Sequence, residues 1–183
     1  MVLPVVIAAA IICLALVYLV QPPADYVPVP PFVPIQPLSA FTEHGVQVAI
    51  TLERDHNGAL VLASTYTPED PDSHVYSKDL PRAGIDGAGR PTLLEVPPQP
   101  SVRAIGPLSA DHPVLLQQFE GFSSAFPIYP DGSVTLRMPI EVTTGAATTM
   151  VDLAVTYMAC SSKGYCLPPV MDKRLAVVLP NMP

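Results

Sequence analysis

The chain has 183 residues, a net charge of -7, 24 prolines and three cysteines. Its acidic balance argues against nucleic-acid binding, because neutralising phosphates requires a basic surface. The proline content excludes a mostly helical fold, since proline breaks helix interiors. Three cysteines are too few for a small domain held together by several disulfides, and a folded region of this size does not need them.

Residues 1–20 form an apolar run without a charged residue. About 20 apolar residues match the length of a membrane-spanning helix. The run lacks the basic start and the small-residue cleavage site of a secretory signal, so we expect a transmembrane anchor, with a cleaved signal helix as the alternative. We therefore expect a single-pass protein of the cell membrane. Its folded part should lie in the periplasm, or otherwise outside the cytoplasmic membrane, where disulfides persist.

Residues 21–37 form a proline-rich segment that favours an extended polyproline II conformation. Its prolines are Pro22, Pro23, Pro28, Pro30, Pro31, Pro34 and Pro37. The segment is either a stalk that holds a domain away from the membrane or a disordered linker. Both interpretations place a domain boundary near residue 38 and predict one folded domain over residues 38–183.

From residue 38 onward, apolar and polar residues alternate with the period of a β-strand, most clearly over residues 46–52 and 133–142. Asn57-Gly58, the favoured pair for a tight hairpin turn, precedes a second strand over residues 60–66. Further strands are expected at residues 92–96, 101–105, 115–120, 150–159 and 173–179. Seven or eight short strands with Pro/Gly-rich connections and no convincing helix predict an all-β fold, a β-sandwich.

Cys160 and Cys166 flank a short segment that contains Gly164. A hairpin-like loop of this size brings two sulfurs within bonding distance. In the preceding strand, every second residue from 151 to 157 is apolar and should face the core. We therefore expect Cys160 to point away from the core and a disulfide at this place to be accessible to another thiol. Lys163 is a nearby cation that would favour a thiolate. Spacing and phase leave two interpretations open, a redox-active disulfide and a structural bridge.

We predict no metal site and no cofactor. Asp70, Asp72 and His74 alternate in a proline-rich loop, where solvated side chains are the simpler interpretation. The other histidines are scattered and lack the spacing of zinc ligands.

The residues around the cysteines closely resemble the active-site hairpin of the N-terminal periplasmic domain of the DsbD family of thiol:disulfide interchange proteins. The shared pattern is a Val-Thr-Tyr run at 155–157, a cysteine, four residues that end in Gly164, the aromatic Tyr165, a second cysteine, and Pro-Pro after one more residue. A looser resemblance covers residues 38–180.

This resemblance implies an immunoglobulin-like β-sandwich whose cysteine pair relays reducing equivalents to thioredoxin-fold redox proteins. It implies that Cys166 meets the partner and that Cys160 resolves the mixed disulfide. The family also has a cap loop whose aromatic residue shields the disulfide. Phe119 and Phe122 are the candidates for it here, in a stretch of three aromatic residues that also holds glycine and serine.

The sequence contains neither a multi-helix membrane domain nor a thioredoxin-like Cys-x-x-Cys motif. We therefore expect one relay domain that takes its reductant from another protein, such as a separate multi-helix membrane thiol transporter. Two alternatives remain. One is a non-catalytic immunoglobulin-like binding module with a structural disulfide, and the other is an accessory factor in the assembly of cytochrome c or of metal sites.

Overall fold

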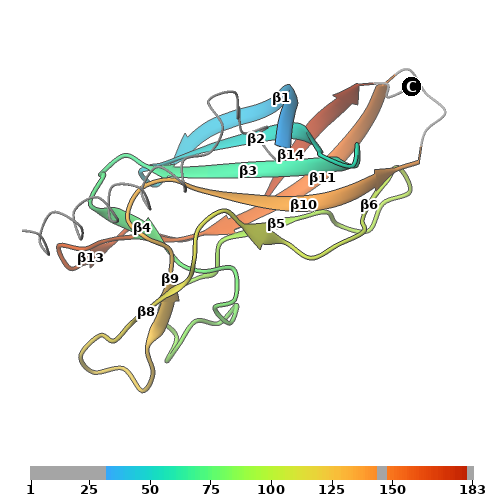
Figure 1. Ribbon diagram of the computed structural model, residues 1–183. Helices are drawn as coiled ribbons and strands as arrows, with labels where there is room; N and C mark the ends of the chain where they lie inside the picture. Colours follow the sequence, from blue (N-terminus) through green and yellow to red (C-terminus); the bar gives the residue numbers. More distant parts are fainter. Residues whose placement is uncertain (1–31, 144–147, 181–183) are drawn as a thin grey trace, which may run out of the picture. The chain divides into compact units, whose positions relative to one another are not determined.

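The computed structural model describes residues 32–143 and 148–180, and all regular elements of this part are β-strands (Figure 1). In these residues there is no helix long and apolar enough to span a membrane. The all-β prediction is confirmed. The predicted N-terminal helix of residues 1–20 lies outside the described residues.

The largest sheet has six strands in the order β1-β2-β3-β10-β6, with β7 paired to β10. Its strands are β1 (Phe32–Glu43), β2 (Val46–Asp55), β3 (Leu60–Pro68), β6 (Val102–Ala104), β7 (Ser109–Ala110) and β10 (Val134–Val142). The predicted turn joins β2 to β3, and Gly58 adopts a φ of 86° that glycine accommodates without strain. The alternating runs of the sequence thus form the centre of this sheet.

The strand β1 begins within the segment that was predicted to be a linker. Residues Phe32 to Pro37 pair with β2, so the ordered domain starts before the predicted boundary at Leu38. Proline is tolerated here because β1 lies at the edge of the sheet, and the register shifts next to Pro34 and Pro37. The rest of the predicted linker lies outside the described residues.

A second sheet has the order β14-β11-β5, and its apolar side chains meet those of the large sheet in one main core. Its strands are β5 (Leu93–Glu95), β11 (Thr148–Tyr157) and β14 (Val170–Pro180). Tyr66 of the large sheet and Tyr157 of the second sheet pack edge to face, with ring centroids 5.5 Å apart. The two sheets therefore form a sandwich, and the finer immunoglobulin-like topology stays a prediction.

One end of the molecule carries a three-stranded sheet of order β13-β12-β4 and a hairpin of β8 with β9 (Figure 1). These strands are β4 (Ser73–Val75), β8 (Leu115–Gln117), β9 (Phe126–Ile128), β12 (Ala159–Ser161) and β13 (Tyr165–Cys166). Here a second apolar cluster forms, which we call the site cluster. Its buried members are Tyr76, Leu80, Phe126, Ile128 and Cys160.

Candidate functional site

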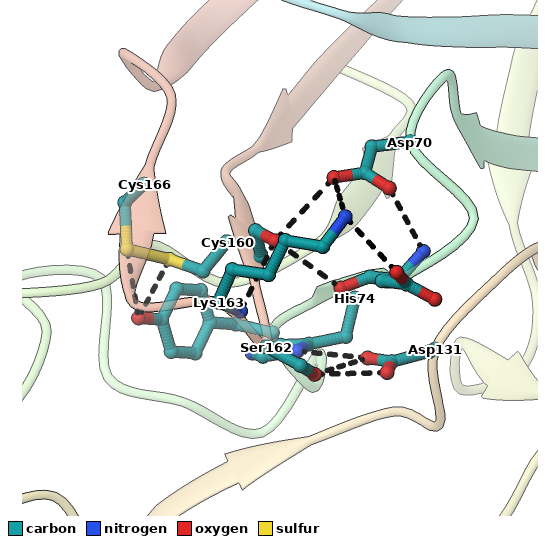
Figure 2. A network of polar contacts seen from close by, with 10 residues as sticks. Asp70, His74, Asp131, Cys160, Ser162, Lys163 and Cys166 are labelled. Carbon is teal, nitrogen blue, oxygen red and sulfur yellow. Dashed lines mark hydrogen bonds and ion pairs between the residues drawn. A yellow bond between two sulfur atoms is a disulfide. The ribbon is translucent and has the colours of Figure 1, made fainter.

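Cys160 and Cys166 form a disulfide between β12 and β13 (Figure 2). The two residues are directly opposite in the strand pairing, and their Cα atoms are 4.0 Å apart. Gly164 closes the turn between them with a φ of 95°, and its N–H donates to the Ser161 carbonyl at 2.9 Å. The short loop thus places both sulfurs on one face of the small sheet, as antiparallel pairing of opposite residues requires.

The two cysteines differ in their exposure to solvent. Cys160 is only 3% exposed and belongs to the site cluster, whereas Cys166 is exposed. Cys160 does face away from the main core, as strand phase predicted. The disulfide is accessible through Cys166, whereas a second apolar cluster covers Cys160 itself. Strand phase describes one sheet and carries no information about what packs over its other side.

The Tyr76 hydroxyl lies beside both sulfurs, 3.1 Å from Cys160 Sγ and 4.0 Å from Cys166 Sγ. Tyr76 follows β4, and its ring is buried in the site cluster. Burial raises the pKa of the Tyr76 phenol, so the hydroxyl keeps its proton at neutral pH and can donate it in a hydrogen bond. Tyr76 was not predicted as a site residue, although it lies two positions after His74 and therefore on the same face of an extended strand.

A cavity of about 210 Å³ lies next to the disulfide and is lined by both cysteines, Phe119 and Phe122. The two phenylalanines come from the loop between β8 and β9. Their rings pack edge to face against Phe126, with centroid distances of 5.4 Å and 4.9 Å. The structure therefore places both cap candidates at the cavity of the disulfide, and it adds Phe126 beneath them.

The loop that carries Phe119 and Phe122 is fastened by polar contacts. The Gln118 side-chain amide donates to the carbonyls of both phenylalanines at 3.1 Å. At the end of the loop the Ser123 N–H donates to Asp86 Oδ2 at 2.9 Å, a contact that lowers the pKa of Asp86. The loop between β8 and β9 is thus joined to the neighbouring 85–88 turn.

Lys163 lies in the turn between the cysteines, and its ammonium is 3.0 Å from Asp72 and 3.6 Å from Asp70 (Figure 2). The pKa of Lys163 is raised, chiefly by its hydrogen bond to Asp72. The pKa of Asp70 is lowered, first by the backbone N–H of Asp72 and then by the Tyr165 hydroxyl, which donates at 3.0 Å. These carboxylates neutralise much of the Lys163 charge. Its predicted effect on a thiolate stays a prediction.

His74 is buried in β4, directly opposite Cys160 in the pairing with β12. Its Nδ1 atom is 3.2 Å from Asp131 Oδ1, and Asp131 also accepts a hydrogen bond from the Ser162 hydroxyl at 2.8 Å (Figure 2). His74 is therefore not a side chain of a solvated loop. Within the described ranges, no group of three or more His, Cys, Asp or Glu side chains is arranged to hold a metal ion.

No family model matches the chain, and no curated protein matches it. Among solved structures, the N-terminal domain of DsbD from Neisseria meningitidis, in its reduced form, is similar to this chain. The two share 16% sequence identity over 90% of this chain and 92% of that domain, with a TM-score of 0.42. Because a fold by itself does not fix a function, the function proposed below rests on the geometry of the site.

Proposed function

We propose that the folded domain is an extracytoplasmic thiol–disulfide exchange domain that relays reducing equivalents through Cys160 and Cys166. One observation carries the proposal. The disulfide borders an apolar cavity, with one cysteine exposed and the other buried beside the Tyr76 hydroxyl. Among the described residues, neither cysteine belongs to the main core, so the bond is not placed where it would staple the sandwich.

In the relay, the Cys166 thiolate attacks one sulfur of a partner's disulfide, and the partner's second sulfur leaves as a thiolate. Cys160, as thiolate, then attacks Cys166 Sγ and releases the first partner sulfur. The domain ends with its disulfide formed, and the partner has gained two electrons and two protons. The exposure of Cys166 and the burial of Cys160 support these roles, because only an exposed sulfur can be reached by a bulky partner.

Tyr76 would act on the charged intermediates of this exchange. A hydrogen bond from its hydroxyl is stronger to a thiolate than to a neutral sulfur, so it stabilises Cys160 whenever that sulfur carries the negative charge. A thiol stabilised as thiolate is also the better leaving group when the domain itself is reduced.

Thioredoxin-fold redox proteins are the proposed partners, and a separate multi-helix membrane thiol transporter is the proposed source of reductant. Residues 1–20 hold the domain at the cell membrane, on the side away from the cytoplasm. The apolar run of that segment supports the anchor, and the persistence of a disulfide outside the cytoplasm supports the location.

Equilibration of the full chain against glutathione buffers tests the proposal. We expect a reduction potential above about -300 mV, which is the range of exchanging rather than structural bridges. In addition, a Cys160→Ser variant should form a mixed disulfide with oxidised glutathione much faster than the matched Cys166→Ser variant, because only the former keeps the exposed sulfur. A potential below about -300 mV would indicate a structural bridge and favour a non-catalytic binding module.

A further inference from the structure

His74 is a buried titratable residue that the exchange mechanism does not use. Its side chain is 1% exposed, and its Nδ1 atom contacts Asp131. The Nε2 atom is buried and has no hydrogen-bond partner in the described part of the chain. A buried nitrogen without a partner lowers stability, so its retention requires an explanation.

The strand pairing places His74 next to the disulfide. In the sheet β13-β12-β4, Cys160 is the middle residue of a row that has Cys166 on one side and His74 on the other. Directly opposite residues project to the same face, with Cβ atoms about 4.5–5.5 Å apart. In the oxidised protein the bond holds Cys160 Sγ toward Cys166. Reduction removes that restraint, and the sulfur can then rotate about the Cα–Cβ bond toward the histidine.

We propose that, in the reduced protein, Nε2 of His74 donates a hydrogen bond to the thiolate of Cys160. The inference rests on the proposed function, since the contact forms only when the disulfide is reduced. The Asp131 carboxylate accepts from Nδ1, fixes the ring and compensates the charge of the imidazolium. His74 acts on the sulfur that leaves when the domain is reduced, and a more acidic thiol leaves faster.

Reduction of the domain by a partner balances in protons and electrons. A partner dithiol supplies two electrons and two protons and becomes a disulfide, while the bond between Cys160 and Cys166 breaks. One proton ends on Cys166 Sγ and the other on Nε2 of His74, which leaves Cys160 as the thiolate.

Other ionisable groups act on the same pair. Those that face His74 or the cysteine loop in the described structure are Asp70, Asp72, Tyr76, Asp131, Cys160, Lys163 and Tyr165. The Lys163 ammonium pairs with Asp70 and Asp72, so the carboxylate of Asp131 remains available to pair with the imidazole of His74. Tyr76 packs edge to face on the His74 ring with centroids 6.1 Å apart, and it adds a second donor to the same sulfur.

The test is the titration of thiolate absorbance in full-length protein that carries both Cys13→Ser and Cys166→Ser, so that Cys160 is the remaining cysteine of the sequence. Adding His74→Gln should raise the pH at which half of Cys160 is ionised by about one unit, a tenfold change in proton affinity. Asp131→Asn should shift it in the same direction. Glu141→Gln is the matched control, because that carboxylate pairs with Arg103 of β6 in the large sheet rather than with the cysteine loop, and it should leave the midpoint within about 0.3 units.

A second readout uses the wild-type chain. The 15N signal of His74 Nε2 should move when the disulfide is reduced, because the atom gains a partner. An unmoved signal, or an unchanged midpoint in a folded His74→Gln or Asp131→Asn variant, overturns the proposal. A reduction potential of the disulfide below about -300 mV would overturn the exchange function. If the ionisation midpoint of Cys160 still shifted in the His74→Gln variant, the hydrogen bond between His74 and Cys160 would remain supported.

Discussion

The buried sulfur of Cys160 lies 3.1 Å from the Tyr76 hydroxyl. Replacing Tyr76 by Phe removes that donor and keeps the ring. We expect reduction of the disulfide by dithiothreitol to slow several-fold. Losing a charge-assisted hydrogen bond raises the pKa of the leaving thiol by roughly one to two units, and a less acidic thiol leaves more slowly. Stopped-flow kinetics measure this.

The Tyr76→Phe variant also tests whether the effect of the phenol on the reduction rate changes with pH. Since burial raises the pKa of Tyr76 above its usual value near 10, the phenol stays protonated from pH 6 to pH 9. The ratio of wild-type to Tyr76→Phe rates should therefore be constant over this range. Tyr129→Phe is the control, because that hydroxyl accepts from the Lys78 N–H rather than contacting sulfur. A similar slowing in the control would contradict a specific role of Tyr76.

The residues of the site were predictable where their signal is local. Cys160 and Cys166 are six positions apart, and their spacing with Gly164 already indicates a hairpin. The contact of Tyr76 with Cys160 spans 84 positions and exists only because β4 pairs with β12. No short-range pattern encodes such a pairing, so neither Tyr76 nor the burial of Cys160 could be derived from strand phase.

At the level of elements, the loop between β8 and β9 should control access to the disulfide. Phe119 and Phe122 line its cavity and pack on Phe126. Replacing both by Ala should speed reduction by dithiothreitol several-fold, because the small thiol then reaches the sulfurs without displacing two rings. An unchanged rate in a folded double variant would show that the loop does not shield the bond.

Two controls accompany the double variant. Removing a fully buried phenylalanine costs about 3–5 kcal/mol, and these half-buried rings should cost less, so thermal unfolding must be measured in parallel. Leu116→Ala changes a side chain on the same hairpin that is 76% exposed. It should leave both the rate and the stability unchanged.

The strands with strict alternation were predicted well, as at β2, β10 and β11. Their apolar faces are buried by the sandwich itself, so the period of two directly reports the fold. The strand β1 was missed because its prolines indicate a linker, and only its edge position makes them compatible with pairing. The strands β4, β7 and β9 are two or three residues long, too short to show a period.

At the scale of the whole molecule, surface carboxylates with lowered pKa values should set how the stability of the fold responds to acid. The pKa of Glu43 is lowered chiefly by a hydrogen bond from Lys173, which links β1 to β14, and those of Asp70 and Asp86 by backbone donors. A lowered folded-state pKa gives stability that is complete above the ordinary value near 4 and is lost as pH falls through the folded value.

We therefore expect the unfolding temperature of the oxidised protein to be flat between about pH 7 and pH 5 and to fall below about pH 4. Calorimetry across this range measures it. Glu43→Gln should weaken the acid dependence. An unfolding temperature that rises between pH 5 and pH 3 would show that these ionised carboxylates do not stabilise the folded protein.

The predicted anchor concerns residues 1–20, which lie outside the described part of the chain. If the apolar run is retained, the protein extracted from membranes should have the mass of the uncleaved chain. Mass spectrometry decides this. A mature N-terminus between Gln21 and Tyr26 would instead identify a cleaved signal.

The main core and the site cluster are separate groups of side chains, and only the site cluster contains a cysteine. The proposed reduction of the disulfide and the proposed movement of the β8–β9 loop would act on the site cluster, whose five buried side chains are separate from those of the main core. The residues of the candidate site and the residues that hold the two sheets together thus belong to different clusters of one small domain. In the proposed exchange cycle, opening and closing the disulfide would therefore rearrange the site cluster and leave the packing of the two sheets unchanged.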